Sequence, residues 1–289
     1  MATAVIPLRT GADGRRIRAT IHAAGLLTAA ALSAFRAAGA QTDYYNTDTG
    51  RPLRIEDAYA TERYSLDLHL APLTIARSRG GDYHWSVEPE LAYGLLPRTQ
   101  VELGVPVVWK AGGDSPLGLA GVQLSALHNF NVETRTFPAL GIRAGVLLPV
   151  GPLAPEQGHA TVQGMATRTF RWARLHLNSA YTFGDAAVTD DAAAGLTRWT
   201  TGMAVDRTFV LQSFLITGEV FASEPLASQG RTEWTLGAGL RYQLTPYSSL
   251  DAGISQQLDG TERATALTFG LARVLGIRVL PPGLGRWRR

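Results

Sequence analysis

Apolar and polar residues alternate along most of the chain with a period of two. In the clearest block, Glu233–Thr245, the even positions from Trp234 to Leu244 are apolar, and the odd positions are glycine or polar. Because successive side chains of a β-strand point to opposite faces, this block predicts a strand with one apolar and one polar face. The other clear blocks are Val101–Val107, Leu140–Leu148, Leu175–Phe183 and Ser248–Asp259.

The spacing of the blocks predicts strands that cross a membrane. About twelve blocks lie between Arg63 and Val274, and roughly 18 residues per strand plus connection suits transmembrane strands of about 9–11 residues. Alternation is weak in Gly118–Asn131 and Thr161–Phe170, so ten or fourteen strands are also compatible with the pattern.

The connections between blocks alternate in length, as they do in outer-membrane barrels, where one rim has short turns and the other has longer loops. The predicted tight turns are Leu96–Thr99, Glu133–Pro138, Trp172–Arg174, Asp206–Val210 and Leu244–Tyr247. The predicted longer loops, rich in glycine, proline, alanine and aspartate, are Ala111–Leu117, Gly151–His159, Asp185–Gly195 and Ser223–Arg231.

A soluble β-sandwich is the alternative to a membrane barrel. Sandwich strands are shorter, with a mode of about 5–6 residues, and their solvent faces carry more charge. Here the polar faces hold mainly glycine, serine, threonine and glutamine, Lys110 is the only lysine, and aromatic residues gather near block ends, as in interfacial girdles. The prediction is an all-β fold, a single antiparallel transmembrane β-barrel over residues 61–276.

The first forty residues predict export. Arg15, Arg16 and Arg18 precede an apolar run, Ile21–Phe35, which ends in an Ala-x-Ala signature at Ala38–Ala40. The run is about 15 residues, shorter than the roughly 20 of a spanning helix. We therefore expect residues 1–40 to be a signal peptide cleaved after Ala40, and the mature chain to lie in a bacterial outer membrane.

Two segments flank the predicted barrel. Residues 41–60 are polar, rich in turn residues and free of alternation, so they either hang in the periplasm or fold into the barrel as a plug. Residues 277–289 form a basic tail. The formal charge of +3 comes from the signal region, because the rest of the chain has 22 basic and 23 acidic residues. No basic patch for nucleic acid remains.

Charged residues on the polar faces are the candidate functional groups. Both signs occur, which favours a partly filled, hydrogen-bonded lumen over a pore lined by charges of one sign. They either form internal ion pairs or line a route for a small solute. The predicted lumen-lining residues are Glu88, Glu90, Glu102, Arg143, His176, Glu219, Glu233, Arg241 and Asp251, and further candidates are Asp67, His69 and His84.

Catalysis and metal binding have little support in the sequence. The histidines are dispersed, no phosphate-binding or dinucleotide-binding glycine motif occurs, and the absence of cysteine excludes thiolate metal sites. Asp82 with His84, and the pair Asp190 and Asp191, supply residue types used by barrel proteases, but aspartate is also common in turns. We expect no enzyme activity, no cofactor and no metal.

Several segments resemble a known group of outer-membrane barrels. They are the lead-in residues Gly50–Pro52 and Ile55–Ala58, the strand–turn–strand units Trp85–Pro106 and Leu127–Gly151, the turn motif at Gly94–Val101 and the strand end Leu148–Gly151. The chain is similar here to the MetA-pathway phenol-degradation family, whose members are commonly labelled transporters. The resemblance implies a barrel that passes small hydrophobic or aromatic molecules, and it carries over no catalytic residue.

One feature departs from the usual barrel pattern. Barrels commonly end on an aromatic residue read by the insertion machinery, whereas this chain ends with Trp287–Arg289 beyond its last strand. Either Phe269 serves as the signal, or the signal differs.

The resulting hypothesis is an outer-membrane channel for passive passage of small, hydrophobic or aromatic solutes. Its partners would be outer-membrane lipid, the barrel-insertion machinery and the solute. A closed structural or adhesive barrel with a filled interior is the first alternative, and a barrel hydrolase is the second.

Overall fold

The computed structural model describes residues 51–70, 72–77, 83–110, 117–185, 196–209, 211–226, 230–259 and 264–276. The predicted signal peptide with its cleavage site, residues 41–50 and the basic tail lie outside the described residues. Within the described ranges, no helix is long and apolar enough to cross a membrane.

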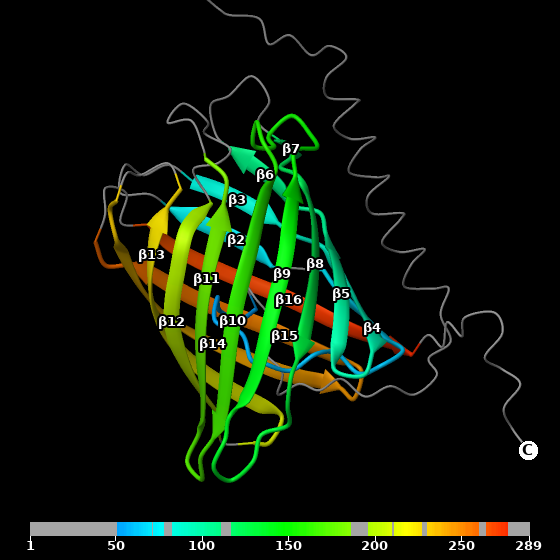
Figure 1. Cartoon of the computed structure of the whole chain (residues 1–289). Coiled ribbons are helices and arrows are strands. Elements are labelled where there is room, and N and C mark those ends of the chain that lie inside the picture. Colours follow the sequence, from blue (N-terminus) through cyan, green and yellow to red (C-terminus); the bar gives the residue numbers. More distant parts are fainter. Residues whose placement is uncertain are drawn as a thin grey trace, which may run out of the picture. The chain divides into compact units, whose positions relative to one another are not determined.

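The described residues form one antiparallel sheet that closes on itself through the pairing of β1 with β16 (Figure 1). Eight of the segments form four pairs, and the two segments of a pair follow each other along one interrupted strand of the barrel wall. The pairs are β1 (Ser65–His69) and β2 (Leu73–Arg77), β3 (Tyr83–Val87) and β4 (Glu90–Leu96), β5 (Thr99–Gly104) and β6 (Val107–Lys110), and β7 (Leu117–Leu119) and β8 (Val122–Asn129). The unbroken strands are β9 (Ala139–Leu148), β10 (His159–Thr169), β11 (Arg174–Phe183), β12 (Thr197–Thr208), β13 (Phe214–Pro225), β14 (Glu233–Thr245), β15 (Ser248–Gln257) and β16 (Thr265–Gly276).

Each pair counts as one strand of the barrel wall. For example, β1 and β2 both pair with β16, in one continuous antiparallel direction. The sixteen described segments therefore make twelve wall strands. This confirms the predicted antiparallel barrel and its strand number.

A row of prolines explains why the first wall strands are broken. Pro72, Pro89 and Pro106 lie in three successive breaks, and proline has no N–H to give to a sheet ladder. Their carbonyl oxygens still accept hydrogen bonds from the neighbouring wall strand; for example, the Val105 N–H donates to Pro89 at 3.0 Å. The uninterrupted strand predicted over Val101–Val107 is therefore wrong at Pro106, although the wall remains bonded across the break.

The alternation of side chains sorts the wall into an apolar outer face and a polar inner face. On β14, Trp234, Leu236 and Leu240 are exposed on the outside, whereas Gly237 and Arg241 are buried inside. The exposed large apolar side chains of the other strands continue this outer surface. An apolar outer face is what a barrel presents to lipid, and it follows directly from the period of two in the sequence.

Two predicted turns are shifted. Arg174 begins β11 and Asp206 lies inside β12, so the tight connections are residues 170–173 and 209–213. Both side chains consequently belong to the barrel interior rather than to a turn. Ser223 and Pro225 likewise belong to β13 and not to a loop. We call the rim with the tight connections the turn end and the opposite rim the loop end.

Residues 51–61, here called the lead-in, run inside the barrel (Figure 1). Ile55 packs against Ala204 and Phe221, and Ala58 packs against a second apolar cluster that includes Leu127. Gly239 and Gly253 make room for this chain: a Cβ at Gly239 would lie 2.8 Å from the Pro52 side chain. The barrel interior is thus shaped around the lead-in.

The outer face yields a depth-dependent prediction. Leu240→Arg, near the middle of β14, should lower the free energy of unfolding by about 2–4 kcal/mol, because it places a charge in hydrocarbon. Leu244→Arg, near the turn end of the same face, should cost about 0–1 kcal/mol. Denaturant titration of the barrel folded in phospholipid vesicles measures both. Equal costs would contradict a lipid-facing β14.

Candidate solute-binding lumen

Side chains of the barrel wall bond the backbone of the lead-in. Since a buried N–H or C=O without a partner is costly, these bonds are what allow an irregular segment to lie inside the barrel. Three lead-in N–H groups donate to the wall: Ile55 to Glu219 (2.8 Å), Glu56 to Asn178 (3.0 Å) and Ala58 to Thr167 (3.0 Å). Three lead-in carbonyls accept from the wall: Glu56 from Asn178, Ala58 from Asn129 and Pro52 from Thr268, each at 2.8 Å.

Arg143 is the centre of the first of three buried ion networks. Its guanidinium donates to both carboxylate oxygens of Glu56 in the lead-in, at 3.0 and 2.7 Å. It also bonds Glu102 on β5, which accepts from Ser125 as well. The Glu56 and Glu102 side chains are only 2% and 4% exposed. One cation thus serves two buried carboxylates, one from the wall and one from the lead-in.

The second network joins β10, β11 and β12. Arg174 donates to both oxygens of Asp206, at 2.9 and 2.7 Å, and lies 3.8 Å from the carboxylate of Asp57 in the lead-in. His176 contacts Asp206 at 3.0 Å through Nε2 and the Thr167 hydroxyl at 3.0 Å through Nδ1. All these groups are buried or nearly so.

The third network lies on β14 and β15. Asp251 accepts from Arg241 at 2.5 Å and from Arg51 at 3.3 Å, and Arg241 also donates to the Arg51 carbonyl at 3.2 Å. Every network therefore contains one lead-in residue: Glu56, Asp57 or Arg51. In each network a lead-in charge lies against a wall charge of opposite sign, so that removing that wall partner would leave a buried lead-in charge uncompensated.

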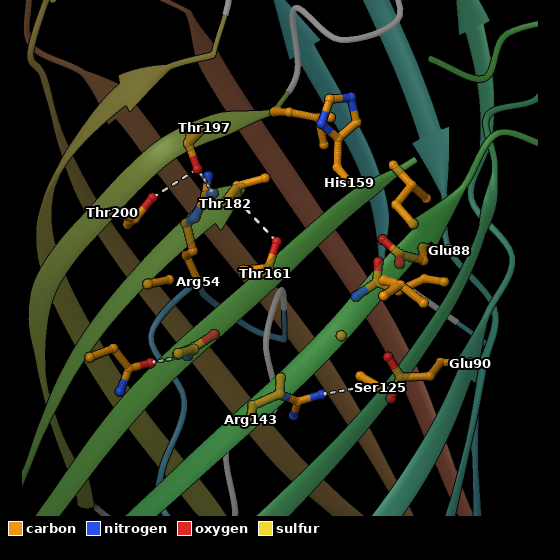
Figure 2. A pocket seen from close by; sticks show the side chains of 18 of the residues that line it. Arg54, Glu88, Glu90, Ser125, Arg143, His159, Thr161, Thr182, Thr197 and Thr200 are labelled. Carbon is orange, nitrogen blue, oxygen red and sulfur yellow. Dashed lines mark hydrogen bonds between the residues drawn. The ribbon is translucent and has the colours of Figure 1, made fainter. Parts of the chain in front are cut away.

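Above the lead-in, toward the loop end, the lumen holds a cavity of about 230 Å³ (Figure 2). Arg54, at the bend of the lead-in, extends into it and is exposed to solvent. Its guanidinium donates to the Thr197 hydroxyl at 3.2 Å and lies 5.4 Å from the centre of the Phe221 ring. The opposite wall carries Glu88 and Glu90.

The structure places the predicted lumen residues in three groups. Glu88, Glu90 and Arg143 line the cavity. Glu102, His176, Glu219, Arg241 and Asp251 are buried and contact the lead-in or its partners. Glu233 lines a second hollow beside Arg54, toward the loop end. Of the further candidates, His69 lies 3.1 Å from Glu90, Asp67 accepts from the Thr61 hydroxyl at 2.9 Å, and His84 is exposed.

Sequence reasoning missed the lead-in charges and two wall residues. The alternation places Arg174 and Asp206 in turns and therefore does not indicate that their side chains point inward. Arg51, Arg54, Glu56 and Asp57 lie in a segment without alternation, and no period shows which way their side chains point. The one available signal is that a short polar segment before a barrel carries four charges of both signs.

No catalytic arrangement faces solvent in the described part of the chain. Thr167, His176 and Asp206 are linked like a nucleophile, a base and an acid, but all three are buried, and Thr167 accepts the Ala58 N–H. Asp82, Asp190 and Asp191 lie outside the described residues. Among the described residues, no three histidine or acidic side chains are arranged to hold a metal ion.

Comparison with known proteins identifies the fold and no family. No protein-family model matches the chain, and no curated protein is similar to it in sequence. The COG4313 outer membrane channel from Pseudomonas putida F1 is 14% identical over 79% of this chain and 100% of that chain, with a TM-score of 0.51. At this identity the likeness concerns the fold, which is that of outer-membrane β-barrels.

Two other solved structures are similar at a lower level. The KdgM porin is 11% identical over 72% of this chain and 98% of that chain, with a TM-score of 0.48. Outer membrane phospholipase A from Escherichia coli is 9% identical over 72% of this chain and 91% of that chain, with a TM-score of 0.41. The comparisons do not show the phenol-degradation family that the sequence resembles.

The Arg143 network yields a stability prediction. Arg143→Met should lower the free energy of unfolding by about 3–5 kcal/mol, because Glu56 and Glu102 stay buried without their cation. Combining it with Glu56→Gln and Glu102→Gln should restore most of the loss. The control is Arg207→Met, on the exposed face of β12, which should change stability by about 0.5 kcal/mol or less. Equal unfolding free energies for the Arg143→Met and Arg207→Met variants in a denaturant titration would refute the network.

Proposed function

We propose that this protein is a passive channel of a bacterial outer membrane, whose lumen is narrowed by its own lead-in. The observation that carries the proposal is the solvent-accessible cavity inside the barrel, directly above residues 51–61. The polar inner face of the wall supports aqueous passage, and the apolar outer face supports placement in lipid. Outer-membrane lipid, the insertion machinery and a small solute are the partners that this role requires.

The lead-in makes the channel selective rather than general. Its backbone and its charges are held by specific side chains, so it obstructs the lumen in a defined way and does not merely fill it. Any solute must pass beside the lead-in or displace it. The solutes are accordingly small. Leu196 at the cavity and Phe221 at the second hollow supply apolar surface for the hydrophobic or aromatic compounds that the family resemblance suggests.

The role is transport, without a cofactor and without catalysis. Selection would come from the width left beside the lead-in and from the charged groups that face the cavity. A closed structural barrel remains the alternative outcome, because the three ion networks fill much of the lower lumen. Measuring solute flux separates the two roles, since a closed barrel passes nothing at any solute size.

The close fit at Gly239 gives a test by mutation. Gly239→Val would push Pro52 and Leu53 away from β14 without removing any charged side chain of the three ion networks. We expect vesicles carrying this variant to swell faster in a small neutral sugar than vesicles carrying the wild-type protein. The control is Gly218→Val on the outer face of β13, where a Cβ meets nothing closer than 3.8 Å.

Wild-type protein should itself admit the sugar faster than protein-free vesicles do. Heat-modifiable gel mobility shows whether the wild-type protein and the Gly239→Val variant are folded. The proposed function fails if both are folded and vesicles carrying either one swell no faster in the sugar than protein-free vesicles.

A further inference from the structure

The polar groups around Arg54 have more hydrogen-bond donors than the protein uses. Arg54 is always charged and carries five N–H donors, of which one bonds Thr197. Among the described residues it forms no ion pair with a carboxylate, although its charge interacts with that of the buried Glu219, whose carboxylate accepts the N–H of Ile55 at 2.8 Å. Because the guanidinium lies in the lumen, this cation is available to a ligand that enters the cavity.

Four threonines beside Arg54 add further donors. Within the described part of the chain, the Thr161 hydroxyl bonds only that of Thr182 (3.0 Å), and the Thr200 hydroxyl bonds only that of Thr197 (3.0 Å), which also accepts from Arg54. In each pair one hydroxyl donates to the other, so one O–H per pair is left without an acceptor. A bulge between Thr197 and Trp199 allows Thr197 and Thr200 both to face inward, although strict alternation would separate them.

His159 is a second, independent sign that the cavity holds hydrogen-bonding groups that the protein does not use. It is 3% exposed and lines the cavity from β10, and neither of its ring nitrogens has a hydrogen-bond partner among the residues that the structure describes. A buried imidazole ordinarily has a partner for its N–H. The cavity therefore presents a cation and unused N–H and O–H donors, a set that calls for a ligand rich in acceptors.

Glu88 and Glu90, the two acidic side chains that line this cavity, lie away from the donor set, whereas Glu233 lines the second hollow beside Arg54. Glu88 and Glu90 belong to the wall strand of β3 and β4, which is halfway round the barrel from β12 and its threonines. Figure 2 shows Arg54 with the threonines on one side of the cavity and the two glutamates on the other. A bound anion would thus be drawn to the Arg54 side and turned away from the glutamates.

We propose that this cavity binds a small organic carboxylate, with its carboxylate group between Arg54 and the threonine pairs and its apolar part toward the centre of the cavity. The Phe221 ring beneath Arg54 holds the guanidinium while leaving its N–H groups for the ligand. The site deepens the proposed function, on which its transport role rests, by naming the class of solute that pauses above the lead-in.

Benzoate and its neutral isostere benzamide are the probes, and equilibrium dialysis against the folded protein in detergent measures binding. Benzoate should bind saturably and about tenfold or more tightly than benzamide, because a charge-assisted bond to arginine contributes more than a neutral one. Arg54→Gln should abolish this preference, and Thr200→Val should weaken benzoate binding. Arg207→Gln, which removes an equal charge from the outer face, should leave both affinities unchanged.

Absence of saturable benzoate binding, equal affinity for the two probes, or an unchanged preference in the Arg54→Gln variant would each overturn the site. Since Arg54→Gln keeps every backbone bond of the lead-in, the variant should fold like the wild type. Thr200→Val is a second variant of the site, and its benzoate affinity tests the same proposal. Dialysis is independent of flux. Binding without vesicle swelling would support the site and refute the channel, whereas swelling without binding would support the channel and refute the site.

Discussion

Every backbone polar group of a membrane-spanning segment must be satisfied within the protein, and this constraint governs both parts of the structure. In the wall it is met by the closed sheet, where even the prolines at the breaks accept bonds from the next strand. In the lumen it is met by side chains, because the lead-in has no ladder of its own. Glu219, Asn178 and Thr167 take the place of a neighbouring strand.

The same side chains explain why the interior is charged. A polar inner wall alone would hold water, whereas matched pairs such as Arg143 with Glu56 bind one segment in one place. Buried ion pairs add little net stability compared with an apolar core, so their value here lies in specifying the position of the lead-in. The cavity above it, with Arg54 at its floor, is the part of the lumen that these networks leave open.

The wall could be predicted from the sequence and the lumen could not. Alternation as regular as that of Glu233–Thr245 fixes which side chains face lipid, and the strand number follows from the spacing of such blocks. It fails where proline interrupts a strand, as at Pro106. The partners of Arg143 and Asp251 depend on the path of the lead-in, and a segment without periodicity gives no direction for its side chains.

The most direct test of the account is the single-channel conductance of refolded residues 41–289 in a planar bilayer, with and without residues 41–58. The account predicts small conductance steps from the protein that keeps these residues and clearly larger steps after the deletion, since most of the lead-in is then gone. Equal conductance from both forms, each shown to be a folded barrel, would contradict the claim that the lead-in narrows the channel.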